Sequence, residues 1–146
     1  MSKEGLERAR AIFAEFPTPP CAATLGWRLV DAEQEAGSVT VAFEATDAFL
    51  NPAGRVQGGF LAAMLDDTMG PAVVVKSGGA LFAPTIQLNV AFLEPARAGA
   101  LRGAGRVVRL GSKIAFLEGR LFDEEGRLVA SATASASLLS TERLRR

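Results

Sequence analysis

The sequence predicts an α+β fold, in which an antiparallel sheet of about six strands curves around one long buried helix. The segment that begins near Gly58 is apolar nearly all round, which is typical of a helix enclosed by protein. The four segments of strand character that follow it are joined by short turns, which indicates antiparallel neighbours. The last of them, 128–139, alternates small apolar and polar residues, so one of its faces can lie close against a helix.

The elements can be placed in chain order from their periodicity. An amphipathic helix is predicted at 3–16, because its apolar side chains form one stripe, and the prolines that follow end it. A hairpin with strands at roughly 27–33 and 38–45 comes next, and a loop over 47–56 leads to the long helix. Pro71 removes one hydrogen bond inside that helix, so its last turns are expected to kink or loosen. The remaining strands are expected at 85–93, 101–109, 113–122 and 128–139.

Composition narrows the class of protein. The 146 residues, 49% of them hydrophobic, fit one domain over 1–146, with the N-terminal helix at 3–16 and the core at 22–139. The 16 basic and 16 acidic residues cancel, so there is no overall field for nucleic acid or an anionic membrane, and neither partner is expected. No apolar run approaches the ~20 residues of a membrane span, and the N-terminus lacks the apolar core of a signal peptide, so a cytoplasmic location is expected.

The chain has no histidine and a single cysteine. Histidine-based triads, histidine–carboxylate dyads and most zinc sites are therefore excluded. We expect no metal and no cofactor, so any chemistry must depend on carboxylates and amides.

The start of the long helix carries the most specific signal. The glycine pair Gly58 and Gly59 allows close approach to the backbone, and the first unpaired N–H groups of a helix carry partial positive charge, which suits an anion or oxyanion. Asp66 lies on the same side of the helix as Gly59, nearly two turns further on, among apolar residues. A carboxylate there must be paired, solvated by a cleft or functional. Asp67 points about 100° away and is expected to be a solvated or interface charge.

Together these residues resemble the hotdog-fold acyl-CoA thioesterases of the phenylacetate-degradation (PaaI-like) group. That family has an Asn, a short loop, His-Gly-Gly, and then an Asp in mid-helix, followed by a strand that often begins with Ser or Thr. The matching residues here are Asn51, Gln57, Gly58, Gly59, Asp66 and Thr85. Glutamine replaces the family histidine. The resemblance covers 22–139 and implies the hotdog fold, which the packing argument also reaches.

The resemblance implies a role for each residue in thioester hydrolysis. Asp66 would be the nucleophile or general base, and the backbone N–H of Gly58 would bind the oxyanion. Asn51 would position water or the carboxylate, and Thr85 would bind the water or Asp66. Gln57 cannot shuttle protons, but its amide can still donate to a thioester carbonyl.

The expected substrate is an acyl-CoA with a medium-chain or aromatic acyl group, and coenzyme A enters only as part of it. Arg109 and Lys113 flank a turn where similar thioesterases hold the nucleotide, although they are equally well explained as hairpin-end charges. Substrate contacts are expected from Gly59, Phe60, Met64 and Phe82, with core packing as the alternative for the larger side chains. The family builds each site across a homodimer, which is expected to pair into a homotetramer.

Other interpretations remain open from the sequence alone. Asp66 could cap or pair with a neighbouring strand, and the Gly58–Gly59 pair could serve only close packing of the helix on the sheet. The chain could be a non-catalytic module that binds acyl-CoA or an acyl effector. A hotdog dehydratase or hydratase is the weaker rival, because those enzymes rely on histidine.

Overall fold

The computed structural model describes residues 3–142 and 144. The helices are α1 (Lys3–Ala14), α2 (Pro20–Leu25), the short 3-10 helix η1 (Asp47–Phe49) and α3 (Gly58–Lys76). The strands are β1 (Arg28–Glu33), β2 (Ser38–Ala45), β3 (Leu81–Phe82), β4 (Thr85–Phe92), β5 (Gly99–Leu110), β6 (Ile114–Phe122), β7 (Leu128–Ser137) and β8 (Leu139–Ser140).

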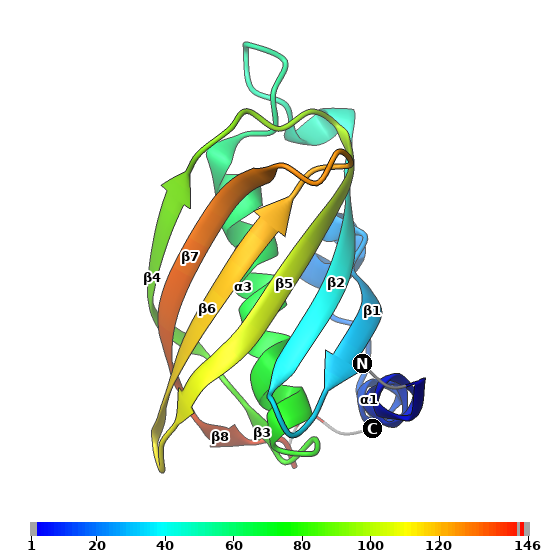
Figure 1. Cartoon of the computed structure of the whole chain (residues 1–146), viewed down its shortest axis with the longest axis vertical. Helices are drawn as coiled ribbons and strands as arrows, with labels where there is room; N and C mark the ends of the chain where they lie inside the picture. The colour runs from blue at the N-terminus through cyan, green and yellow to red at the C-terminus, as the bar shows by residue number, and fades with distance from the viewer. Residues whose placement is uncertain (1–2, 143, 145–146) are drawn as a thin grey trace.

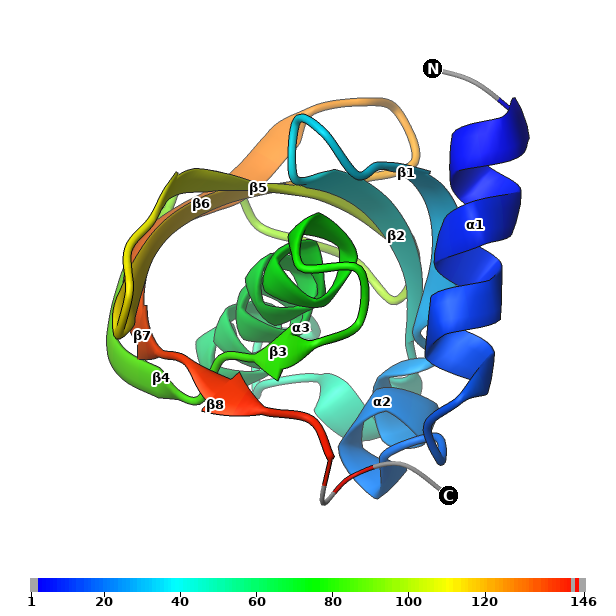
Figure 2. The ribbon, with the colours of Figure 1, turned by 90° about the horizontal axis from the view of Figure 1, so that it is seen from below.

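A six-stranded sheet in the order β1-β2-β5-β6-β7-β4 forms the body of the molecule, and its neighbouring strands are all antiparallel. Figure 1 shows this sheet in front of α3, and the view from below in Figure 2 shows it curving around the helix. α1 lies outside this arrangement, beside β1. The predicted α+β hotdog architecture is therefore confirmed.

α3 packs closely against the sheet because glycines on β5 and β6 face it. A Cβ atom on Gly103 would lie 2.2 Å from the hydroxyl oxygen of Thr68, and one on Gly105 would lie 2.7 Å from the Thr68 carbonyl oxygen. On β6, a Cβ at Gly119 would lie 2.9 Å from Cγ of Met69. Side chains at these positions would therefore push the helix away from the sheet.

β7 shows the predicted two-residue period. From Ala130 onward its alanines are buried in the core and its polar residues alternate with them along the strand. The alternating buried set is Ala130, Ala132, Ala134 and Ala136, and Val129 before them is buried as well. Small side chains on this strand help to keep the sheet close to α3, as the sequence indicated.

α3 continues as an α-helix through Pro71 to Lys76, so its last turns do not loosen as expected. In an α-helix the N–H of residue 71 would donate to the carbonyl of Asp67, and proline has no N–H. The indole N–H of Trp27 donates to that carbonyl instead, at 2.9 Å. A side chain 40 positions away thus satisfies the acceptor that Pro71 leaves free.

Some elements were not predicted. The N-terminal helix ends at Ala14, and the proline-rich segment after it starts a second helix, α2, with Pro20 at its first position. Proline is well tolerated there, since the first N–H groups of a helix have no helical acceptor. η1 and the small β3–β8 pair were also missed, because two- and three-residue elements leave no periodic pattern.

By length and composition alone, α3 would also qualify as a membrane span, which the sequence analysis did not anticipate. It has 19 residues and a mean hydropathy of 1.2. Its side chains instead fill the concave face of the sheet, and core helices of this kind share the apolar character of membrane spans.

The close approach at Thr68 predicts a large effect of one methyl group. Gly105→Ala should lower the free energy of unfolding by about 1–3 kcal/mol, because the new Cβ meets a main-chain oxygen that cannot rotate away. The matched control is Gly70→Ala on α3, where a Cβ has nothing within 4 Å. That variant should be neutral or gain up to about 1 kcal/mol, since alanine favours helix over glycine. Urea unfolding at one fixed protein concentration measures both; equal effects would contradict the close packing.

Candidate active site

The carboxylate of Asp66 is held by a hydroxyl from the edge of the sheet. Thr85 Oγ1 donates to Asp66 Oδ1 at 2.6 Å. Thr85 is the first residue of β4, next to an irregularity in the pairing of β4 with β7, and Asp66 lies in the middle of α3. Asp66 is half-buried, so the hydrogen bond orients it while it can still meet a ligand. The structure thus brings together two of the residues that the sequence pattern singled out.

Asp67 is not a solvated charge, which was one of the two alternatives that the sequence analysis offered. It is half-buried, and its Oδ2 atom is buried without a hydrogen-bond partner among the residues that the structure describes. Burial, and then the nearby charge of Asp66, raise the pKa of Asp67 to about 6. Helical periodicity could not show which neighbours cover this side chain.

The start of α3 presents amide donors. Gln57 is the N-cap residue, and its Oε1 accepts a hydrogen bond from the Gly59 N–H at 2.7 Å. The amide oxygen of Gln57 is therefore committed to the helix, which leaves its NH₂ group as the end that can meet a ligand. The N–H of Gly58 is the first amide of the helix and has no hydrogen-bond acceptor among the described residues.

An aromatic ring explains why position 58 is a glycine. A Cβ atom there would lie 3.2 Å from Cζ of Phe92, at the end of β4. The ring of Phe92 therefore packs directly against the backbone of Gly58, at the first amide of α3. This contact is consistent with the packing interpretation of the glycine, and it also places an apolar side chain beside the candidate oxyanion donor.

Asn51 shapes the loop before α3. Its Oδ1 accepts hydrogen bonds from the backbone N–H groups of Ala53 and Arg55, at 2.9 and 3.1 Å. The loop is further anchored by the N–H of Val56, which donates to the carbonyl of Ala96. The side-chain amide oxygen of Asn51 therefore holds the loop, and within one chain it does not bind Asp66.

Within one chain, the two halves of the predicted chemistry are far apart. Gly58 and Asp66 lie eight residues apart on the same straight run of helix, which at 1.5 Å per residue is about 12 Å. A reacting carbonyl must lie about 3 Å from both the attacking group and the oxyanion donor. One chain therefore cannot present Asp66 and the Gly58 N–H to the same thioester.

The residues expected to contact the acyl group differ in how deeply they are buried. Met64 is completely buried among core side chains, so it is removed from the set of residues that face a substrate. Phe60 is half-buried and stacks on Phe49, with ring centroids 4.2 Å apart and planes 8° from parallel. Phe82 lies in β3 and is half-buried.

The basic pair proposed for the nucleotide lies at one end of the β5–β6 hairpin. Arg109 and Lys113 are both exposed on either side of the turn. They are available to a phosphate, and they are equally placed to be ordinary surface charges.

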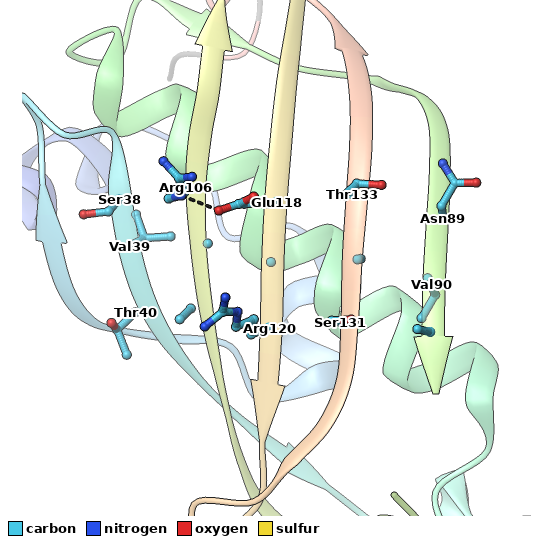
Figure 3. Close-up of a pocket in the computed structure, with 15 residues that line it drawn as sticks. Ser38, Val39, Thr40, Asn89, Val90, Arg106, Glu118, Arg120, Ser131 and Thr133 are labelled. Atoms are coloured by element: carbon cyan, nitrogen blue, oxygen red, sulfur yellow. Dashed lines mark hydrogen bonds and ion pairs between the residues drawn. The ribbon is translucent and has the colours of Figure 1, made fainter. Parts of the chain in front are cut away.

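A broad hollow lies on the other face of the sheet. It has a volume of about 770 Å³ and is lined by residues of β2, β4, β5, β6 and β7 (Figure 3). Arg106 and Glu118 form an ion pair across its floor, and Arg120 lies beside them. Figure 3 shows that α3 lies on the opposite side of the sheet from this hollow. None of the predicted catalytic residues lines the hollow.

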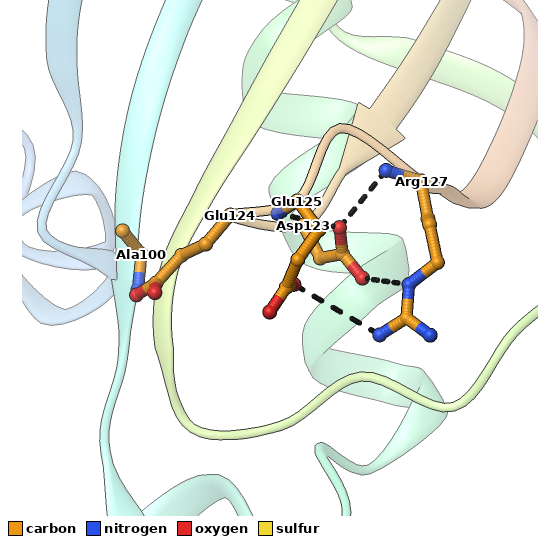
Figure 4. Close-up of polar contacts among 5 residues, drawn as sticks. All are labelled: Ala100, Asp123, Glu124, Glu125 and Arg127. Atoms are coloured by element: carbon orange, nitrogen blue, oxygen red, sulfur yellow. Dashed lines mark hydrogen bonds and ion pairs between the residues drawn. The ribbon is translucent and has the colours of Figure 1, made fainter.

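A second charged cluster lies at the β6–β7 turn (Figure 4). Arg127 donates through its backbone N–H and its Nε to the carboxylate of Asp123, at 2.9 and 2.8 Å, and Glu124 accepts from the N–H of Ala100. Burial acts to raise the pKa of Asp123, but the hydrogen bonds and charge of Arg127 outweigh it and hold that pKa below its usual value. The carboxylates of Asp123 and Glu124 thus have partners in the turn and on β5, which makes this a structural cluster.

Comparison with known proteins agrees with this arrangement. The profile of the thioesterase superfamily matches residues 53–130. A protein of Saccharolobus solfataricus that bears an esterase name is 31% identical over 108 residues, which are 74% of this chain and 76% of that one. The chain belongs to the thioesterase superfamily and is a hotdog-fold thioester hydrolase.

Solved structures place the chain more closely. A phenylacetic acid degradation-related protein from Ralstonia eutropha JMP134 is 43% identical, with a TM-score of 0.80 over 89% of this chain and 98% of that one. The resemblance to the phenylacetate-degradation thioesterases is therefore confirmed. A Streptococcus mutans protein solved with bound acetyl-CoA is 25% identical, with a TM-score of 0.69 over 82% of this chain and 91% of that one.

The raised pKa of Asp67 predicts a pH-dependent loss of stability. The folded state binds this proton more tightly than the unfolded state, so stability falls as the pH rises from 3.8 through about 6. Asp67→Asn removes the ionised form, and it should be more stable than the wild type at pH 8 by about 1–2 kcal/mol, a value discounted for partial exposure. Below pH 4 the difference should vanish. Urea unfolding at both pH values tests this, and a difference independent of pH would rule out the ionisation as its cause.

Proposed function

We propose that the protein hydrolyses an acyl-CoA thioester with a medium-chain or aromatic acyl group to the free acid and coenzyme A. The observation that carries this proposal is the hydrogen bond from Thr85 to Asp66, which orients a half-buried carboxylate in a thioester hydrolase. Asp66 attacks the thioester carbonyl carbon, or it takes a proton from a water that does so. The carbonyl oxygen becomes an oxyanion, and as it collapses the carbon–sulfur bond breaks and coenzyme A leaves as a thiolate, which takes up the proton released from water. Where Asp66 itself attacks, the acyl group is left as an anhydride on Asp66, and water hydrolyses it to the free acid and restores the carboxylate.

The oxyanion is stabilised by the start of α3. The N–H of Gly58 is the main donor, and the helix end adds partial positive charge. Gln57 supplies a second donor through its NH₂ group, because its amide oxygen is held by the N–H of Gly59. In this proposal glutamine replaces the family histidine as an orienting group and takes no part in proton transfer.

Two chains complete each site. The separation of about 12 Å between Gly58 and Asp66 along one helix requires the oxyanion donor from one subunit and the carboxylate with Thr85 from the other. The edge strand β4 supports this assembly, since in the described part of the chain it pairs with one strand, β7, and it exposes large apolar side chains, with Ile86 57% and Phe92 55% exposed. Exposed strand edges are usually covered, so we propose a homodimer that pairs into a homotetramer.

Coenzyme A is the carrier that best fits the charges. A protein with zero net charge must meet phosphates with a local basic pair, and Arg109 and Lys113 are exposed at one hairpin end. The acetyl-CoA complex of the Streptococcus mutans relative supports the same carrier.

A second candidate is a non-catalytic module that binds acyl-CoA. It is favoured by one observation: Gln57, in place of the family histidine, caps the helix and is fully explained by that structural role. A hydratase or dehydratase has no such support in a chain without histidine. Release of free thiol over a panel of acyl-CoAs separates hydrolysis from binding.

Asp66→Asn should remove nearly all turnover while the protein stays folded. If Asp66 is a general base, the expected loss is about 10²–10⁴-fold. Asp67→Asn is the matched control, because it makes the same change one residue along and should have a far smaller effect. Steady-state thiol release measures both. An active Asp66→Asn, or equal losses for the two variants, would show that Asp66 is not the catalytic carboxylate.

Gln57 can be tested by three substitutions. Gln57→Ala should lower kcat by a factor approaching ~10²–10³, the usual effect of removing an oxyanion donor. Gln57→Glu should be worse, since it sets an acceptor against the developing negative charge, and Gln57→His should be tolerated. Hydrolysis of one good acyl-CoA by all three is the measurement. Unchanged kcat in both the alanine and the glutamate variants would mean that Gln57 does not touch the reacting carbonyl.

A mixing experiment tests the shared site. Asp66→Asn and Gln57→Ala damage different halves of the site, so a heterodimer of the two variants has one intact site and one doubly damaged site. With free exchange, half of the dimers in an equal mixture are heterodimers, and activity should recover to about a quarter of the wild-type value. A folded, active monomer in ultracentrifugation, or no recovery despite exchange shown by labelled subunits, would contradict the shared site.

A further inference from the structure

A hydrogen bond from Trp27 replaces one that Pro71 removes from the helix that carries Asp66. Pro71 cannot donate to the carbonyl of Asp67, and its ring also crowds that carbonyl. The indole N–H of Trp27 donates to the same carbonyl at 2.9 Å. The main chain next to Asp66 is therefore held by a side chain from outside the helix, at a position where proline removes the helix's own bond.

The ring that makes this bond is itself held in place. Trp27 follows α2, whose last turn is capped by Gly26 with a φ of 69°, and its backbone N–H donates to the carbonyl of Ala22 at 2.9 Å. Phe13 of α1 contacts the indole edge-on, with ring centroids 5.3 Å apart and planes at 62°. The N-terminal helices thus fix the direction in which the indole N–H points.

Three contacts converge on consecutive residues of α3. Thr85 binds the carboxylate of Asp66, and Trp27 binds the carbonyl of Asp67. Thr68 fits against glycines of β5, where a Cβ atom would clash with it. Thr85 can only aim a carboxylate whose backbone is already in place, and Trp27 holds the main chain one residue further along.

We infer that Trp27 is a positioning residue for catalysis, and that its indole N–H replaces the amide missing at Pro71 so that Asp66 is held where it can react. This inference rests on the proposed role of Asp66. Loss of the bond should free the turn that carries Asp66, and misplacing a reacting group by about 1 Å can lower the rate by ~10²-fold. Substrate binding by other residues should be little affected.

The test uses Trp27→Phe, which keeps an aromatic ring but removes the N–H. We expect kcat to fall by about tenfold, less than for a full 1 Å displacement, while KM stays within about twofold. The double variant Trp27→Phe/Pro71→Ala returns an N–H at position 71 to the helix, and it should recover most of the lost kcat. Pro71→Ala alone should keep kcat close to the wild-type value, because the carbonyl has two lone pairs and can accept from both donors.

Thr141→Val is the control for a purely structural effect. Thr141 is buried, and its hydroxyl donates to the carbonyl of Gly79 at 2.6 Å, in the loop beyond the far end of α3. The variant therefore loses the same kind of bond, from a side chain to a main-chain carbonyl, away from Asp66. It should lose stability but keep kcat.

The outcomes separate this inference from the proposed function. If Trp27→Phe leaves kcat unchanged, lowers it no more than Thr141→Val does at similar stability, or is not rescued by Pro71→Ala, the positioning role is wrong. If the wild type hydrolyses no acyl-CoA, the proposed function fails. The hydrogen-bond replacement can then still be tested by stability alone. The free energies of unfolding of the wild type, the two single variants and the double variant give the coupling energy between positions 27 and 71, and a coupling energy of zero would show that Trp27 does not replace the missing N–H.

Discussion

The close contact between α3 and the sheet is the constraint on which the rest of the structure depends. Thr68 can lie against β5 because Gly103 and Gly105 have no side chains there, and a Cβ atom on either would clash with it. The buried alanines of β7 are small, so this strand also allows the helix to pack closely. A helix enclosed in this way is shielded from water on its sheet side. Every polar group on it must therefore find a partner in the protein, face an opening or change its protonation.

The two adjacent aspartates of α3 show two of these solutions. Asp66 faces the edge of the sheet and is bound by Thr85, so it can remain both oriented and reachable. Asp67, one residue on, has a buried oxygen without a partner among the described residues, and its pKa is raised to about 6. The same side-chain chemistry thus gives a candidate catalyst in one position and a destabilising group in the next.

Two further features of α3 bear on function: the proline at position 71 and the distance between Gly58 and Asp66. The proline leaves an acceptor that the helix cannot satisfy, and Trp27 satisfies it from the N-terminal part of the chain. The length of α3 keeps its amide end and its carboxylate apart, which makes a second copy necessary for the proposed chemistry. Both features follow from one uninterrupted helix that lies along the concave face of the sheet.

The sequence by itself determined the architecture, because the two-residue period of 128–139 and the apolar character of the segment after Gly58 are local patterns that fix which face of each element is buried. Asp66 was singled out by its place on the apolar helix, the resemblance added Thr85, and the structure brings these two together. Only the tertiary structure decided that Asp67 is covered, that Met64 belongs to the core and that Trp27 replaces the bond lost at Pro71. These outcomes depend on contacts between residues distant in sequence, and no local periodicity records which element packs over a given side chain.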